Sequence, residues 1–208
     1  MLEKLKGVRK VTKSKNGLNF SNLFNFSNLC NFSNLSNIFM MITKATAADI
    51  PELTALINSA YRGDASFKGW TTEAHMIDGQ RIGTADLEEQ FADPDASILK
   101  HTEADGSITG CVYLKKQGEK IYLGTLSVSP LLQAQGIGRK LLEAAEIYAS
   151  EASINTIMIT VITLREELIA WYERRGYRKT GEIVPLQIPE NFGVLKQPLD
   201  MYKLEKEV

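Results

Sequence analysis

The stretch of sequence that decides the fold runs from Leu126 to Leu142 and reads Leu-Ser-Val-Ser-Pro-Leu-Leu-Gln-Ala-Gln-Gly-Ile-Gly-Arg-Lys-Leu-Leu. Its first part is apolar and β-branched, it breaks at Pro130, and after two glycines it takes on helical spacing. This pattern predicts a strand, a loop and a helix. Gly136 and Gly138 would let backbone N–H groups approach a phosphate at the start of that helix without interference from a Cβ atom. A plain tight turn can carry the same Gly-x-Gly pattern, so the rest of the chain has to decide between the two.

The bulk composition is that of an ordinary globular protein with 208 residues, 44% apolar and 24% charged, which predicts one well-buried core. The net charge of −1 gives no overall attraction to nucleic acid or to an anionic membrane, and we expect neither as a partner. Cys30 and Cys111 lie far apart, which predicts neither a disulfide framework nor a metal site and fits a reducing compartment such as the cytoplasm. No apolar run approaches the roughly 18 residues that span a bilayer.

Residues 1–40 differ from the remainder. The hexapeptide Phe-Ser-Asn-Leu-x-Asn occurs three times between Phe20 and Asn37, and six basic residues stand against Glu3 alone, so this segment carries +5 and leaves −6 for the rest. So short a repeat cannot bury a core in three copies, which predicts a low-complexity, disordered extension before a domain at 41–208. The segment resembles a transit peptide, and it also fits an upstream extension before a start at Met40 or Met41, which we favour. A self-associating tail is a third alternative.

The domain itself is predicted to alternate strands and helices. Apolar residues at three-to-four spacing predict a helix from about Ile50 that Gly63 ends, and Thr84 is expected to cap a shorter one. Turn clusters separate three strands of an antiparallel meander, and residues 154–162 predict a central strand parallel to the third of them. In order, we expect strands at 42–45, 97–101, 108–115, 120–129 and 154–162, helices at 50–61, 84–91, 137–148 and 165–175, and edge strands at 177–180 and 199–205.

The long connection at residues 62–83 is the first candidate for binding residues. It has weak periodicity, four glycines, and a high density of Trp, Glu, His, Asp and Arg side chains. Loops on a rigid scaffold often carry binding residues, so Trp70, Glu73 and His75 are candidates for contact with a substrate. The alternative is a polar connection that Trp70 pins to the core.

Two motifs in this order resemble the GNAT superfamily of acyl-CoA-dependent N-acetyltransferases. Gln133-Ala134-Gln135-Gly136-Ile137-Gly138 fits the Q/R-x-x-G-x-G/A signature of that family. Trp171-Tyr172-Glu173-x-x-Gly176-Tyr177 resembles its F/L-Y-E-x-x-G-F/Y element. The resemblance covers residues 41–205. It implies an α+β fold with a mixed, mainly antiparallel central sheet, flanked by helices, and a parallel strand pair around the CoA site.

The resemblance also implies acetyl-CoA as co-substrate and no metal. The backbone of Leu126, Ser127 and Val128 would then bind the pantetheine arm like an added strand. The pyrophosphate would lie on the loop and first helical turn formed by Gln133, Ala134, Gln135, Gly136, Ile137, Gly138 and Arg139. Arg139 and Lys140 would add positive charge at the rim of this site.

Acyl transfer needs a proton donor for the departing thiolate, a donor to the oxyanion, and an acceptor for the proton of the amine. Tyr172 matches the tyrosine that this family commonly uses as general acid, and a backbone N–H near Val128 is expected to meet the oxyanion. Many relatives carry a basic carboxylate on the strand that corresponds to residues 121–125, but this sequence has none there. Glu73 is the substitute candidate, with His75 behind it.

These residues predict an N-acetyltransferase that moves acetyl from acetyl-CoA to a primary amine by direct attack in a ternary complex. Cys111 could suggest an acyl-cysteine intermediate, but its apolar neighbours predict a buried structural thiol. A catalytically silent acyl-CoA-binding or sensor module and an unrelated nucleotide-binding fold are the alternatives. A small-molecule acceptor is favoured over a protein because no acidic groove is evident, and the sequence leaves a homodimer open.

Overall fold

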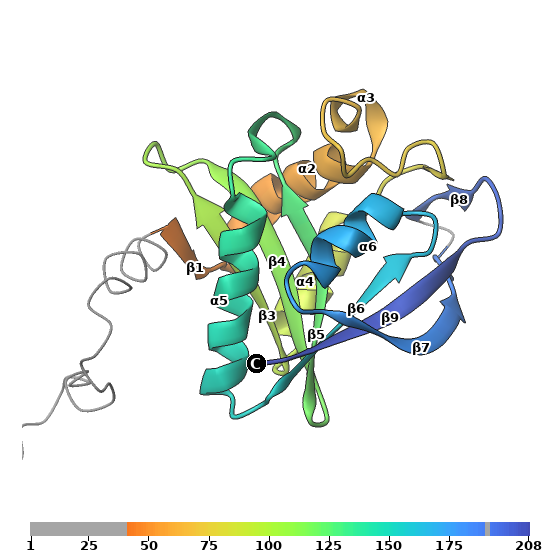
Figure 1. The fold of residues 1–208 in the computed structure, drawn as a ribbon. Helices are drawn as coiled ribbons and strands as arrows, with labels where there is room; N and C mark the ends of the chain where they lie inside the picture. Colours follow the sequence, from red (N-terminus) through yellow and green to blue (C-terminus); the bar gives the residue numbers. More distant parts are fainter. Residues whose placement is uncertain (1–40, 190–191) are drawn as a thin grey trace, which may run out of the picture.

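The computed structural model describes residues 41–189 and 192–208, and the predicted extension at 1–40 lies outside them. Seven strands form one sheet in the order β1-β3-β4-β5-β6-β9-β7 (Figure 1). Neighbouring strands are antiparallel except for β5 and β6, which are parallel. The expected α+β class with one parallel pair is therefore confirmed. The strands are β1 (Ile42–Lys44), β3 (Ala96–Thr102), β4 (Ile108–Gln117), β5 (Lys120–Val128), β6 (Thr156–Ile162), β7 (Arg178–Pro185) and β9 (Asp200–Glu207).

Helices cover both faces of this sheet. Helices α2 (Ile50–Tyr61) and α4 (Thr84–Ala92) lie on one face, and α5 (Ile137–Glu151) and α6 (Glu166–Glu173) lie on the other (Figure 1). The alternation of side chains along β4 explains both layers, because Val112 and Leu114 join the core under α5 while Cys111 faces the core under α2. Shorter helical turns are η2 (Ala47–Asp49), α3 (Gly63–Ser66) and η3 (Pro130–Leu132).

Helix α2 ends at Tyr61 as expected, and Gly63, with a φ of +67°, begins the short helix α3. One helix start differs from the sequence-based expectation, because helix α4 takes Gly83 as its N-cap instead of Thr84. The carboxylate of Asp86 accepts a hydrogen bond from the Gly83 N–H at 2.8 Å, which satisfies one of the free donors at this terminus.

The expectation that residues 199–205 form an edge strand is wrong. Strand β9 lies between β6 and β7, and only β7 borders the sheet on that side. Charged side chains are tolerated on this interior strand because Lys203 and Lys206 pair with Glu182 and Glu146. A two-residue pair, β2 (Ile77–Asp78) with β8 (Val194–Leu195), was also not predicted, because it is too short to show a periodic pattern.

The parallel pair β5–β6 opens within a few residues, and this opening positions the site. The two strands pair only at Ile121 with Ile157 and at Tyr122 with Met158. On the other side of β5 the register with β4 shifts by one residue, and Thr125 there has a φ of +49°. A bulge of this kind bends a strand away from its neighbour. Beyond it, β5 and β6 present their backbones and side chains to the space between them.

Within the described ranges, no helix combines the length and the apolar character needed to cross a bilayer.

Candidate active site

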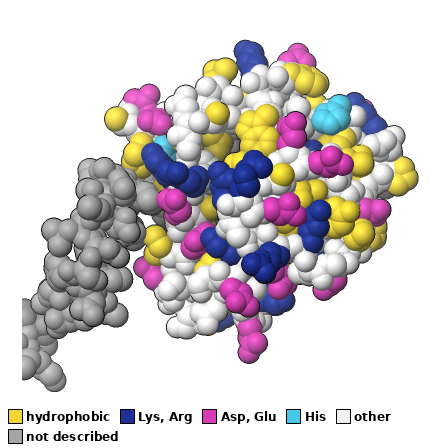
Figure 2. Space-filling view, in the orientation of Figure 1, with side chains coloured by type: hydrophobic (Ala, Val, Ile, Leu, Met, Phe, Trp, Pro, Cys, Tyr) yellow, Lys and Arg dark blue, Asp and Glu magenta, His cyan; other side chains and the backbone are white. Residues whose placement is uncertain are grey.

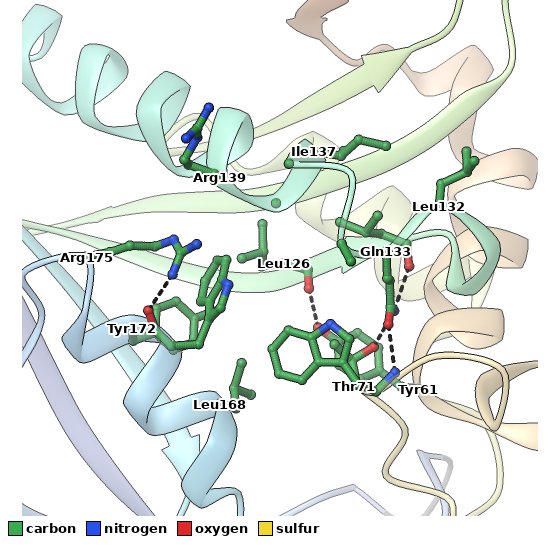
Figure 3. A pocket seen from close by; sticks show the side chains of 16 residues that line it. Tyr61, Thr71, Leu126, Leu132, Gln133, Ile137, Arg139, Leu168, Tyr172 and Arg175 are labelled. Atoms are coloured by element: carbon green, nitrogen blue, oxygen red, sulfur yellow. Dashed lines mark hydrogen bonds between the residues drawn. The ribbon is translucent and has the colours of Figure 1, made fainter.

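Two adjoining cavities lie where β5 and β6 diverge. The larger, the α5 cavity, has a volume of about 440 Å³ and lies between the start of α5, the end of β5 and helix α6 (Figure 3). It is lined by Tyr61, Trp70, Thr71, Leu126, Val128, Leu132, Gln133, Ala134, Gly136, Ile137, Gly138, Arg139, Leu168, Trp171, Tyr172 and Arg175. Nine of these sixteen residues belong to the sequence stretch from Leu126 to Leu142, which contains the Gly-x-Gly pattern.

Left-handed backbone conformations build the turn into α5. Gly136 is the N-cap with a φ of +85°, and Ala134 adopts a φ of +67°, which is uncommon for a residue with a Cβ atom. Gly110 on β4 lets the helix start lie close to the sheet, because a Cβ there would be 2.9 Å from the Ile137 side chain. A Cβ on Gly138 would contact the Trp171 ring at 3.6 Å, so the glycine keeps the cavity open at this point.

Arg139 and Arg175 both line the α5 cavity, and Arg139 at its rim is exposed and lies 3.4 Å from the Glu143 carboxylate (Figure 3). Arg175 stacks on the Trp171 ring, with 3.7 Å from its guanidinium carbon to the ring centroid, and donates a hydrogen bond to the Trp171 carbonyl. Burial and then repulsion from Arg174 and Arg139 lower the pKa of Arg175. Basic side chains gather between the start of α5 and α6 in Figure 2, beside exposed apolar ones. Positive charge that repels itself favours an anionic ligand.

The side chain of Gln133 connects the phosphate-type loop to the loop at 62–83. Its Oε1 accepts a hydrogen bond from the Trp70 N–H at 2.8 Å, and its Nε2 donates to the Thr71 hydroxyl and the Val128 carbonyl (Figure 3). The amide lies directly over Gly69, where a Cβ would come within 2.5 Å of it. The loop expected to carry substrate contacts is therefore held against the end of β5.

The second cavity, the β6 cavity, has a volume of about 270 Å³. It lies between the diverging β5 and β6, the 62–83 loop and the segment at 186–188. Four residues line both cavities, namely Tyr61, Leu126, Leu168 and Tyr172. The two cavities thus adjoin at these side chains, two of which are tyrosines.

Tyr172 is 6% exposed and lies among aromatic rings, edge-on to Trp171 and to Tyr177. Burial, and after it the neighbouring tyrosines, raise the pKa of Tyr172 well above its usual value. The Tyr61 hydroxyl donates to the Leu126 carbonyl at 2.5 Å, and burial raises the pKa of Tyr61 to about 12. Both phenols therefore keep their protons at neutral pH.

Glu73 lies in the wall of the β6 cavity, where its carboxylate pairs with the Arg62 guanidinium at 2.5 Å. Trp70 lies at the mouth of the α5 cavity, with 6.3 Å between its ring centroid and that of Trp171. His75 is exposed and lines neither cavity. The structure thus brings Glu73 and Trp70 to the site and leaves His75 outside it.

The residues expected to hold the co-substrate divide in the same way. Leu126, Val128 and the run from Gln133 to Arg139 line the α5 cavity, except Gln135. The Ser127 side chain is buried toward the other face and donates to the Thr125 carbonyl. Lys140 turns toward Met41, so Ser127, Gln135 and Lys140 lie outside the cavity lining.

Cys111 is a buried thiol, as predicted, and burial raises its pKa to about 12, which suppresses nucleophilic chemistry. The part of the chain that the structure describes contains no group of three or more His, Cys, Asp or Glu side chains that could hold a metal ion.

Sequence reasoning missed three residues of the site. Tyr61 was assigned to the buried face of its helix, and that face extends into both cavities. Arg175 comes directly before the glycine that ends the Trp-Tyr-Glu motif, and its position one turn after Trp171 was the available signal. Arg81 lines the β6 cavity from the far end of the 62–83 loop, and no local pattern marks it.

Solved structures of N-acetyltransferases share the fold of this chain. The structure is similar to the ribosomal-protein-S18-alanine N-acetyltransferase from Escherichia coli, with a TM-score of 0.60 at 16% identity over 80% of this chain and 92% of that one. It is also similar to the ribosomal-protein-alanine N-acetyltransferase from Brucella melitensis, with a TM-score of 0.56 at 21% identity over 81% and 99% of the two chains.

The chain belongs to the acetyltransferase (GNAT) family, whose family model matches residues 57–177. This match confirms the family resemblance that the two sequence motifs indicated. A curated relative, the "Probable N-acetyltransferase camello" of Xenopus laevis, is 24% identical over 149 residues. The match covers 70% of this chain and 66% of that protein, which is just under two thirds of the relative's length.

Proposed function

We propose that the protein transfers an acetyl group from acetyl-CoA to a primary amine by direct attack within a ternary complex. The family supports acetyl transfer in general. The observation that carries the finer proposal is the pair of adjoining cavities with a buried tyrosine shared between them. One cavity can hold the donor and the other the acceptor, so that the two reactants meet beside Tyr172.

The residues of the α5 cavity fit acetyl-CoA. Its volume of about 440 Å³ lies within the usual range of small-molecule sites, roughly 300–1,000 Å³. The start of α5 offers backbone N–H groups, and Arg139 with Arg175 offers two positive charges, which together suit a pyrophosphate. The apolar side chains of Leu126, Val128 and Leu132 suit the pantetheine arm that leads toward Tyr172.

The chemical step needs only the groups at the junction of the cavities. The lone pair of the amine attacks the thioester carbon, the C–N bond forms, the C–S bond breaks, and the electron pair of that bond stays on sulfur. Tyr172 then donates its proton to this sulfur. Burial that raises the pKa of the phenol also raises the pKa of a thiolate formed beside it, so the two groups remain matched for proton transfer.

Glu73 is the proposed acceptor for the proton of the amine. Among the described residues that line the β6 cavity, it is the only carboxylate. Arg62 fixes its Oε2, and the carboxylate takes the proton directly or through a water molecule. This assignment replaces the strand carboxylate that the sequence lacks.

The proposal is tested by calorimetric titration of the full chain with CoA, followed by thiol release from acetyl-CoA over a broad panel of amines. We expect saturable CoA binding and thiol release that depends on an amine. Absence of CoA binding would reject the proposal. Binding without thiol release for any amine would identify a silent acyl-CoA-binding module instead.

A further inference from the structure

The charges in the wall of the β6 cavity are unequal. Three arginines line it, Arg62, Arg81 and Arg165, against the single carboxylate of Glu73. A cavity partly screened from water makes each unit charge count for more than it does at the surface, because the effective dielectric constant is lower. The imbalance therefore bears on which acceptor this cavity takes, an inference that rests on the proposed function.

Two of the three arginines are engaged in the protein. Arg62 is 7% exposed and is paired with Glu73. Arg165 donates to the carbonyls of Trp70, Thr71 and Thr72, at 3.2, 3.1 and 3.4 Å. These carbonyls satisfy its hydrogen bonds, but they do not cancel its charge.

Arg81 is the arginine that remains for a ligand. Its side chain is half-buried, and its guanidinium carbon lies 5.6 Å from the ring centroid of Tyr61. Within residues 41–189 and 192–208, no carboxylate lies within ion-pair distance of Arg81. A planar guanidinium held over an aromatic ring by a cation–π contact can bind a carboxylate through two parallel hydrogen bonds.

We infer that the acceptor carries a carboxylate close to its amine, as a free amino acid does, and that Arg81 binds this carboxylate. Tyr61, over whose ring the Arg81 guanidinium lies, lines both cavities. A carboxylate held at Arg81 therefore lies near the junction at which the amine must attack, which requires a short separation between the two groups. The cavity volume of about 270 Å³ is below that of typical drug-sized sites, which fits an acceptor of amino-acid size.

The test compares matched acceptors with the full chain at saturating acetyl-CoA. Each standard L-amino acid is assayed beside its amide and its decarboxylated amine. We expect kcat/KM at least about tenfold higher for the acids that react, in line with a charge-assisted hydrogen bond. Arg81→Gln should raise KM for the acids by about 10- to 100-fold and change KM for the amides little. Arg81→Lys should keep part of the preference, and Arg178→Gln, on the exposed face of β7, should keep all of it.

Amides or decarboxylated amines that react as well as the acids would overturn this inference, and CoA binding with acetyl transfer would leave the proposed function standing. A second readout does not need turnover. Amino acids should raise the melting temperature of the CoA-bound protein more than their amides do, and this difference should vanish in Arg81→Gln. Equal shifts for acids and amides would also overturn the inference. Failure of CoA binding itself would instead reject the proposed function.

Discussion

The α5 cavity and the β6 cavity share four residues but are built in different ways. The α5 cavity takes most of its lining from two short runs, Leu126 to Arg139 and Leu168 to Arg175, and depends on left-handed backbone at Ala134 and Gly136. The β6 cavity collects its lining from segments spread between Tyr61 and Met201. Local backbone geometry therefore builds the proposed donor side, and long-range packing builds the proposed acceptor side.

Substitution of the shared residue Tyr172 should produce the largest effect, because it removes the proposed proton donor. Tyr172→Phe should lower kcat by between about 100-fold and 10,000-fold, the usual range for a general acid, and leave CoA affinity nearly unchanged. Steady-state kinetics and calorimetric titration measure the two quantities. Tyr177→Phe is the matched control, since Tyr177 is equally aromatic and buried beside Tyr172 but lines neither cavity. Unchanged turnover of Tyr172→Phe at every pH would remove the acid role.

Arg175 should produce the next largest effect, and one confined to the donor side. Arg175→Gln removes both a charge and the stack on Trp171, so we expect CoA affinity to fall by roughly tenfold or more. Acceptor KM should stay the same, and the salt dependence of CoA binding should weaken. Arg174→Gln is the control, because the Arg174 side chain is adjacent in sequence to Arg175 but is exposed and lies outside the α5 cavity. Equal losses in both variants would show that the charge acts only at long range.

The same contrast explains how much the sequence predicted. The strand, turn and helix around Gly136, the parallel β5–β6 pair and the position of Tyr172 all follow from periodicity and from motifs within a few residues, and the structure contains each element. Arg81 has no local pattern, and the helical pattern of Tyr61 marks it only as buried, because the packing of α2 against β5 is what brings the Tyr61 side chain to the site. Strand β9 was misplaced because its neighbours in the sheet are set by long-range pairing with β6 and β7, which a local sequence pattern does not reveal.

The contact between Gly69 and Gln133 joins the two sides, and breaking it should have a moderate effect on both. A Cβ at Gly69 would force the Gln133 amide away and release the Trp70 and Thr71 contacts. Gly69→Ala should therefore cost about 1–2 kcal/mol of stability and raise KM severalfold for both substrates. In a Gln133→Ala background the added methyl meets no amide, so the cost of Gly69→Ala should nearly vanish. A full double-mutant cycle by denaturant unfolding measures this coupling, and additive costs would contradict it.

The pH dependence should show the smallest effect, because burial holds both shared tyrosines in their neutral form. The raised pKa of Tyr172 and of Tyr61 means that neither phenol loses its proton as pH rises from about 7 to 10. With an alkyl amine as acceptor, kcat/KM should rise over this range as the amine loses its proton, and it should not fall again. If kcat/KM fell with rising pH below about pH 10, and Tyr172→Phe abolished this fall, the raised pKa of the buried Tyr172 would be contradicted.

Stability provides the independent check on the same tyrosines. Above about pH 10 the unfolded chain releases phenolic protons that the folded chain retains, so the unfolded state binds fewer protons and the free energy of unfolding must fall as pH rises. Tyr177→Phe removes one of the buried phenols with a raised pKa, and the slope between about pH 10 and 11 should become shallower in this variant. Since Tyr177 lines neither cavity, its kcat/KM profile should match that of the unaltered protein. A shallower pH dependence of the unfolding free energy, together with an unchanged kcat/KM profile, would show that the buried Tyr177 phenol affects stability and not the proposed proton donor.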